Sequence, residues 1–158
     1  MRNRRSTAGS VYVETLIAIL VPFFFFFIIW QLADLLTAQL IVKHAAVAAA
    51  RAAIVVGPDD ERFYEGEEPN QFEENGVRFR DVTTAAALIL AASPHFHPPS
   101  PEVKLSGKFG PEGQLTATVT AEYHCLSGWL NVACRGKESI PLSGTAVLPY
   151  QGADYEYR

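Results

Sequence analysis

The longest apolar stretch of the chain lies near its N-terminus, where no charged residue interrupts the run from Leu16 to Trp30. Apolar residues on both sides extend it to about 20 residues, the length that a helix needs to cross the core of a bilayer. We place the transmembrane part at about residues 13–33. Pro22 lies inside it, so we expect a kink or a short melted stretch from Ala18 to Pro22, because proline lacks the amide hydrogen of a regular helix.

The helical pattern continues beyond the apolar run as far as Val56, which predicts one long helix over residues 10–56. Gly57 and Pro58 then favour a helix end. The part of this helix beyond the membrane is expected to pack either on the protein's own sheet or on the helices of neighbouring subunits. An apolar stripe at spacings of three, four and seven residues indicates that the helix is amphipathic. The alanines favour helix-to-helix packing, with simple stiffening as the alternative. The stripe is Leu32, Leu35, Leu36, Leu40 and Val47, and the alanines are Ala45, Ala46, Ala48, Ala49, Ala50, Ala52 and Ala53.

The C-terminal half alternates between apolar and polar residues, which predicts strands. From Leu115 to Tyr123 every odd position is apolar and every even position is polar, as in a strand with one buried face. Val103 to Phe109 is expected to pair with it in a hairpin. Ile140 to Tyr150 offers a third strand, with its two prolines at the ends or on an edge. The expected fold class is therefore α+β, with a long N-terminal helix packed on a small antiparallel sheet.

A short extra helix is expected between the long helix and the strands. The segment Asp81–Ser93 has the composition of about three helical turns, with Asp81 or a threonine as its cap. Leu88, Ile89 and Ala92 are expected to pack inward.

Three polar segments offer candidate sites, and for each we favour a plain structural role. The acidic connector from Asp59 to Asp81 lacks the ligand spacing of an EF-hand, so we expect a solvated loop. Pro94–Pro101 is interpreted as a rigid spacer, in which His95 and His97 lack the further ligands of a zinc site. Asp34, just beyond the transmembrane part, is expected to be solvated, with pairing to a neighbouring cation as the alternative.

The charges indicate which side of the membrane each part occupies. Arg2, Arg4 and Arg5 precede the apolar run without an acidic residue among them, which places the N-terminus in the cytoplasm and residues 57–158 in the periplasm or outside the cell. A cleaved secretory signal is the alternative, but a cut after Ala33 would lack the small residue required three positions before the cut. The formal net charge is −4 with these arginines included, so the remainder is acidic and nucleic acid is not an expected partner.

Glu14 is the unusual residue of the apolar segment, because carboxylates in membranes are costly and mark candidate functional sites. If the chain were cut between Gly9 and Ser10, the new α-amine of Ser10 would lie one helical turn before Glu14. The positive end of the helix dipole favours a carboxylate at the same place. The cut would therefore create a partner that neutralises Glu14.

Gly9-Ser10 followed by Glu14 and an apolar helix resembles the cleavage signature of type IV prepilins. Further matching positions are similar to the TadE-like minor pilins and pseudopilins of the tight-adherence (Flp, type IVb) pilus system, namely Arg4-Arg5, Val13-Glu14, Leu20-Val21-Pro22 and Ala48-Ala49-Ala50-Arg51-Ala52-Ala53. The resemblance covers Gly9 to Ala53 and is thin beyond. It implies a pilin-like fold, a leader of residues 1–9 that a prepilin peptidase removes after Gly9, and a role for Glu14 in recognition and assembly.

Cys125 and Cys134 are the two cysteines of the chain, and the arginines place both on the oxidising side of the membrane. We therefore expect a disulfide. A redox site is disfavoured, since it would use Cys-x-x-Cys. Trp129 and Leu130, inside the closed loop, are expected to be buried, with contact to a partner as the alternative.

No motif of a catalytic nucleophile, phosphate loop, zinc site or paired carboxylates is present, so we expect no catalytic residue, cofactor, metal or small-molecule substrate. The expected function is that of a structural minor pilin or pseudopilin of the cytoplasmic membrane, which enters or primes a tight-adherence pilus. Its expected partners are membrane lipid, the prepilin peptidase, other pilin subunits and the pilus assembly platform. The alternative is a permanently anchored periplasmic scaffold or ligand-binding protein of a secretion apparatus.

Overall fold

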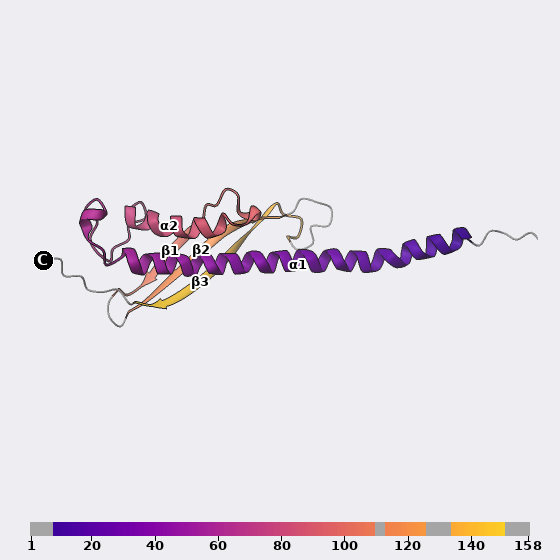
Figure 1. Cartoon of the computed structure of the whole chain (residues 1–158), viewed down its shortest axis with the longest axis horizontal. Coiled ribbons are helices and arrows are strands. Elements are labelled where there is room, and N and C mark those ends of the chain that lie inside the picture. Colours follow the sequence, from indigo (N-terminus) through magenta and orange to yellow (C-terminus); the bar gives the residue numbers. More distant parts are fainter. Residues whose placement is uncertain (1–7, 110–112, 126–133, 151–158) are drawn as a thin grey trace, which may run out of the picture.

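One helix, α1 (Ala8–Val56, 49 residues), runs through the whole molecule in this computed structural model (Figure 1). The structure describes residues 8–109, 113–125 and 134–150, and the side chains from residue 11 onward. The helix ends at Val56 as predicted. It remains helical through Pro22, so the melted stretch is not present, although the N-terminal part of the ribbon is inclined to the rest (Figure 1).

The sheet has three antiparallel strands in the order β1-β2-β3, formed by β1 (Glu102–Gly107), β2 (Gln114–His124) and β3 (Ser139–Pro149). In the centre of the sheet, Ala117 of β2 lies opposite Leu105 of β1 and Ala146 of β3. The odd-numbered residues of β2 from Leu115 to Tyr123 are buried and the even ones are not, which confirms the alternation expected from the sequence. The prolines of β3 lie on an edge strand, where their missing amide hydrogens do least harm.

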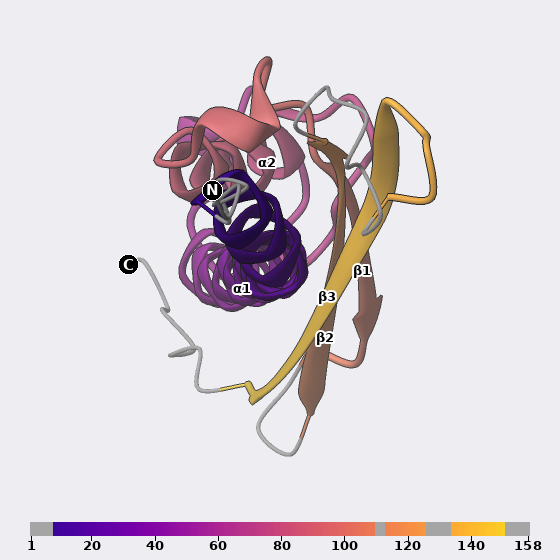
Figure 2. The same ribbon diagram turned by 90° about the vertical axis from the view of Figure 1, so that its right-hand side faces the viewer.

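The two helices cover the same face of the sheet (Figure 2). The shorter helix, α2 (Val77–Leu90), begins four residues before the predicted start at Asp81. Its buried side chains are Arg78, Val82, Ala86 and Leu90, at successive spacings of four residues. The prediction that three side chains of this helix pack inward is mostly wrong. Leu88 is 69% exposed and Ala92 is exposed, while Ile89 is half-buried.

The predicted apolar stripe of α1 is only partly turned toward the core. Leu32, Leu36 and Leu40 are exposed, whereas Leu35 and Val47 are partly buried against the core. The buried face of α1 is formed by smaller residues, namely Ala38, Val42, Ala45, Ala46, Ala49, Ala50 and Ala53. They lie against α2, β2 and β3 of the same chain, so the packing expected with helices of other subunits is made within the molecule.

The close approach of helix and sheet requires these small side chains. A Cβ added to Gly144 of β3 would lie 2.8 Å from the Cα of Lys43 and 2.8 Å from the carbonyl oxygen of Val42. The backbones of β3 and α1 are therefore nearly in contact at this point. The architecture is the expected α+β arrangement, a long apolar helix with a small antiparallel sheet and one short helix.

Candidate functional site

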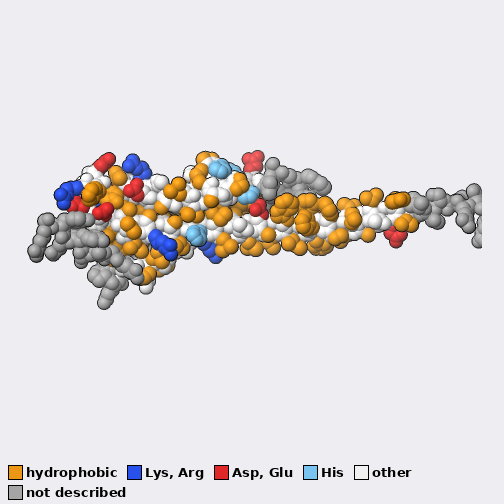
Figure 3. Space-filling view, viewed as in Figure 1, with side chains coloured by type: hydrophobic (Ala, Val, Ile, Leu, Met, Phe, Trp, Pro, Cys, Tyr) orange, Lys and Arg blue, Asp and Glu red, His pale blue; other side chains and the backbone are white. Residues whose placement is uncertain are grey.

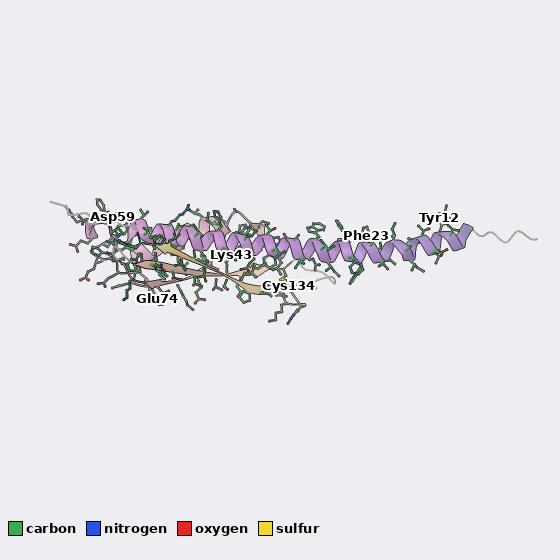
Figure 4. The ribbon with its side chains drawn as sticks, turned by 90° about the horizontal axis from the view of Figure 1, so that it is seen from below. Tyr12, Phe23, Lys43, Asp59, Glu74 and Cys134 are labelled. Atoms are coloured by element: carbon green, nitrogen blue, oxygen red, sulfur yellow. A yellow bond between two sulfur atoms is a disulfide. The ribbon has the colours of Figure 1, made fainter. Side chains whose placement is uncertain are left out.

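The N-terminal half of α1 is uncovered by the rest of the chain. From Val11 to Phe26 every side chain is exposed, and the space-filling view has an almost continuous hydrophobic surface there (Figure 3). Figure 4 places Tyr12 and Phe23 on this bare part, whereas Lys43 and Asp59 lie beside the folded head. Within the described part of the chain, this is the one helix long and apolar enough to cross a membrane.

Aromatic side chains cover this uncovered segment on several sides. Phe23 and Phe27 lie edge to face with ring centroids 5.3 Å apart, and Phe27 stacks on Trp30 at 6.2 Å. These contacts lie within a single helix, so most of each ring still faces outward. From Leu16 onward this surface is suited to hydrocarbon or to other apolar helices, because its exposed side chains as far as Phe26 are all apolar.

Glu14 is the exposed carboxylate in this apolar surface. No described side chain forms an ion pair or a hydrogen bond with it. By contrast, the hydroxyl of the neighbouring Thr15 donates to the carbonyl oxygen of Val11 at 2.8 Å, so it is satisfied within the helix. Glu14 is thus a charged group that still requires a partner if the segment enters lipid.

The predicted cleavage pair lies at the start of the same helix. The backbone of Gly9 and Ser10 belongs to the first turn of α1, one turn before Glu14, while their side chains are outside the described residues. The structure therefore brings the backbone of the predicted pair and Glu14 onto one helical element.

Asp34 lies four residues beyond Trp30, where α1 reaches the head, and it is not simply solvated as predicted. Its Oδ2 atom accepts a hydrogen bond from the hydroxyl of Tyr123 at 3.2 Å and lies 3.1 Å from Nε2 of His95. Burial, with the Asp34 carboxylate as the second cause, raises the pKa of Tyr123 to about 12. Asp34 therefore ties the helix to the sheet.

The spacer interpretation of residues 94–101 is also wrong in part. A short 3₁₀ helix, Pro94–Phe96, begins the segment, and the Phe96 side chain is 1% exposed. Its ring meets that of Tyr123 edge to face at 6.0 Å. The segment thus seals the end of the core and holds His95 against Asp34.

The acidic connector is organised by Arg78, which the sequence did not single out. The guanidinium is fully buried and donates to the carbonyl oxygens of Val56, Gly57, Asp59 and Glu67. It also lies over the ring of Tyr64, 4.1 Å from the centroid. The first part of the connector is therefore folded as a cap on the end of α1, although most acidic side chains of the connector are exposed to solvent as predicted, among them Glu61, Glu65 and Glu68.

Glu67, in the same connector, supplies the cap of α2. Its carboxylate accepts hydrogen bonds from the amides of Val77 and Arg78, whereas Gly76 at the N-cap position has no side chain to do so. The predicted cap, Asp81, lies inside the helix and is exposed. Sequence spacing could not reveal this cap, because Glu67 is ten residues from the amide that it binds.

Cys125 and Cys134 form the predicted disulfide. They close the connection between β2 and β3 at the end of the sheet where Tyr123 meets Asp34. Trp129 and Leu130, which the sequence predicts to be buried, lie outside the described residues.

The head has a cleft of about 330 Å³, which is lined by Phe72, Glu74, Phe79, Lys104, Leu105 and Phe109. Phe72 and Phe109 stack on each other at 5.2 Å. Within the described ranges, no three histidine, cysteine or acidic residues cluster as metal ligands would. Searches of protein-family models, curated proteins and solved structures found no match to this chain.

Proposed function

We propose that this protein is a structural minor pilin or pseudopilin, which uses the uncovered half of α1 as its assembly element. A prepilin peptidase would cut after Gly9, and the mature helix would then join a tight-adherence pilus or prime its assembly. In this proposal the N-terminus is cytoplasmic, the head is periplasmic, and other pilin subunits are the partners in the filament.

One observation carries the proposal: a single continuous helix is bare and apolar in its first half and forms the core of the head in its second half. Residues 11–26 are exposed on every side, whereas Val42, Ala46 and Ala50 are fully buried. A plain membrane anchor needs no such continuity with the head. A filament subunit does, because its helix must hold the head at a fixed place relative to its neighbours.

Glu14 adds the second reason. A carboxylate near the centre of a bilayer costs about 2.5–3.5 kcal/mol, and less toward the edge. Cleavage after Gly9 would leave a positive α-amine one helical turn away, on the same face of the helix. The amine of the same or a neighbouring subunit would then supply the partner that Glu14 lacks among the described side chains.

Mass spectrometry of the intact protein tests the processing step. When the protein is expressed with a prepilin peptidase, the proposal predicts a chain that begins at Ser10. When the peptidase is inactive, the full-length chain should be recovered. Recovery of full-length protein in both cases would overturn the proposal and favour a permanently anchored scaffold.

Substitution of Glu14 tests the assembly step. Glu14→Ala should remove the protein from the sheared pilus fraction while it remains in the membrane fraction. Thr15→Ala is the matched control, because the Thr15 hydroxyl bonds only to the backbone of its own helix. Equal recovery of both variants in the pilus fraction would contradict the role of Glu14.

A further inference from the structure

The helix α1, the short 3₁₀ helix and β2 meet at Asp34. We call Asp34, His95 and Tyr123 the exit cluster, because Asp34 lies four residues beyond Trp30, where α1 leaves the apolar segment. The Asp34 carboxylate is contacted by the Tyr123 hydroxyl and by Nε2 of His95 through the same oxygen, Oδ2. The second ring nitrogen of His95, Nδ1, lies 3.2 Å from the carbonyl oxygen of His124. One imidazole thus bridges α1 and β2.

The number of protons on His95 decides how many of these contacts can form. Both ring nitrogens face oxygen atoms that accept hydrogen bonds and have no proton to donate. A neutral imidazole carries one N–H group and can donate to only one of them, whereas the imidazolium donates to both. The protonated form also gains the attraction of the Asp34 carboxylate at 3.1 Å.

The surroundings of His95 strengthen this dependence on charge. The side chains of His95 and Asp34 are 20% and 25% exposed, and attraction between opposite charges is stronger where water is partly excluded. From β2, the Tyr123 ring lies 4.9 Å from the imidazole, centroid to centroid. Because the pKa of Tyr123 is raised to about 12, its phenol stays neutral, and Asp34 is the charged group that faces the imidazole.

We propose that the exit cluster is a pH-sensitive latch, which protonation of His95 closes and deprotonation loosens, between the head and α1. The latch stabilises the contact while both ring nitrogens of His95 carry a proton, and it loses this contribution when one proton leaves, so the contact should be stronger at acid pH than at alkaline pH. It fixes the head to the helix at the point where, under the proposed function, the helix leaves the membrane. The latch itself does not depend on processing at Gly9.

Hydrogen exchange of the full-length protein in detergent micelles, at pH 5.5 and pH 8, tests the latch. The amides of His95 and Phe96 are the reporters, because they donate to Ser93, the N-cap residue of the short helix. At pH 5.5, Asp34→Asn and His95→Asn should each raise the opening constant of these amides by about tenfold or more, the effect of losing a charge-assisted hydrogen bond. At pH 8 each should raise it by about twofold or less.

The effects of Asp34→Asn and His95→Asn on the opening constant should not be additive. At pH 5.5 the double variant should open no more than either single variant, since the first substitution already removes the shared contact. His97→Asn is the matched control, because His97 is an exposed histidine two residues away, and it should change neither value. Tyr123→Phe should weaken protection at both pH values and keep the pH dependence.

Equal effects of Asp34→Asn at the two pH values would overturn the latch, as would a pH dependence that survives His95→Asn. These outcomes are independent of the proposed function, because the measurement uses the uncut chain outside any filament. Mass spectrometry reports the cut after Gly9, and hydrogen exchange reports the latch. The two experiments therefore distinguish a protein that is cut but has no latch from one that has the latch but is never cut.

Discussion

Replacement of Arg78 should unfold the far end of the head, because this one side chain joins the end of α1 to the connector and to α2. The guanidinium is fully buried, and it donates to four carbonyl oxygens, including those of Val56 and Gly57 at the end of α1. Arg78→Met keeps much of the length of the side chain and removes its charge and its donors.

The magnitude follows from the groups left behind. Each buried carbonyl that loses its donor costs about 1–3 kcal/mol. Several of these carbonyls are partly buried, so water can replace some of the bonds, and the desolvation cost of the arginine is recovered. We therefore expect a net loss of about 3 kcal/mol, near the lower end for broken buried networks. Such a loss corresponds to an increase of about a hundredfold in the opening constant.

Hydrogen exchange of the β2 amides, in the centre of the sheet, is the assay on the detergent-solubilised protein. Arg78→Lys should lose less than Arg78→Met, since an ammonium group can still donate to up to three of the carbonyls. Arg80→Met is the control, because Arg80 lies on the same helix but is exposed. If Arg78→Met accelerated exchange no more than Arg80→Met, the buried guanidinium would not be what holds this end together.

Three further predictions concern the packing of the head and its junction with α1. Gly144→Ala should destabilise the head by about 1–3 kcal/mol, because the new Cβ would lie 2.8 Å from the backbone of Lys43. In the same urea titration Ser143→Ala, at the exposed neighbouring position, should change the unfolding free energy by less than about 0.5 kcal/mol. Reduction of the Cys125–Cys134 disulfide should lower that free energy by roughly 2.5–3 kcal/mol, the chain-entropy contribution of a loop of this length, and the alkylated Cys125→Ser variant should match the reduced protein. In an ultraviolet titration Tyr123 should ionise near pH 12, and Tyr123→Phe should remove that step, because burial and Asp34 raise the pKa of Tyr123. Since the raised pKa favours the protonated native state, the contribution of Tyr123 to stability should be lost as the pH rises from about 10 to about 12.

The elements with simple periodicity could be predicted from the sequence. The alternation from Leu115 to Tyr123 places one face of β2 in the core, and the apolar run with its Gly57-Pro58 stop gives the course and the end of α1. Both patterns arise from local rules, namely the two-residue period of a strand and the geometry of a helix end. Neither rule depends on which distant residue becomes a neighbour.

The face of α1 that is buried could not be predicted from hydrophobicity alone. Leucine is more apolar than alanine, so the pattern favoured a stripe from Leu32 to Val47, of which the structure leaves Leu32, Leu36 and Leu40 exposed. The buried face is instead chosen by size, because β3 approaches so closely at Gly144 that bulky side chains would not fit. This requirement appears only when the sheet and the helix are placed together.

The polar contacts of Arg78 and Asp34 could not be predicted from the sequence either, because their partners are distant in the chain. Arg78 binds carbonyl oxygens up to 22 residues away in the chain, and Asp34 is 89 residues from Tyr123. Carbonyl acceptors leave no signature in a sequence, since every residue has one. The sequence therefore predicted only a solvated connector, although the buried Arg78 and the capping Glu67 order it.

The helix α1 is uncovered in its N-terminal half and buried in the head in its C-terminal half, so it connects the two parts of the molecule rigidly. Residues 38–53 of the helix form the centre of the head, with Val42 and Ala46 fully buried, while residues 11–26 are free to contact lipid or other helices. No loop separates the two halves, so a neighbour that packs on the bare half acts directly on the core of the head. The exit cluster lies between them and ties the helix to β2 through Asp34. Its state should therefore set how rigidly the head follows the helix, which is why we expect the protonation of His95 to matter most at this one junction.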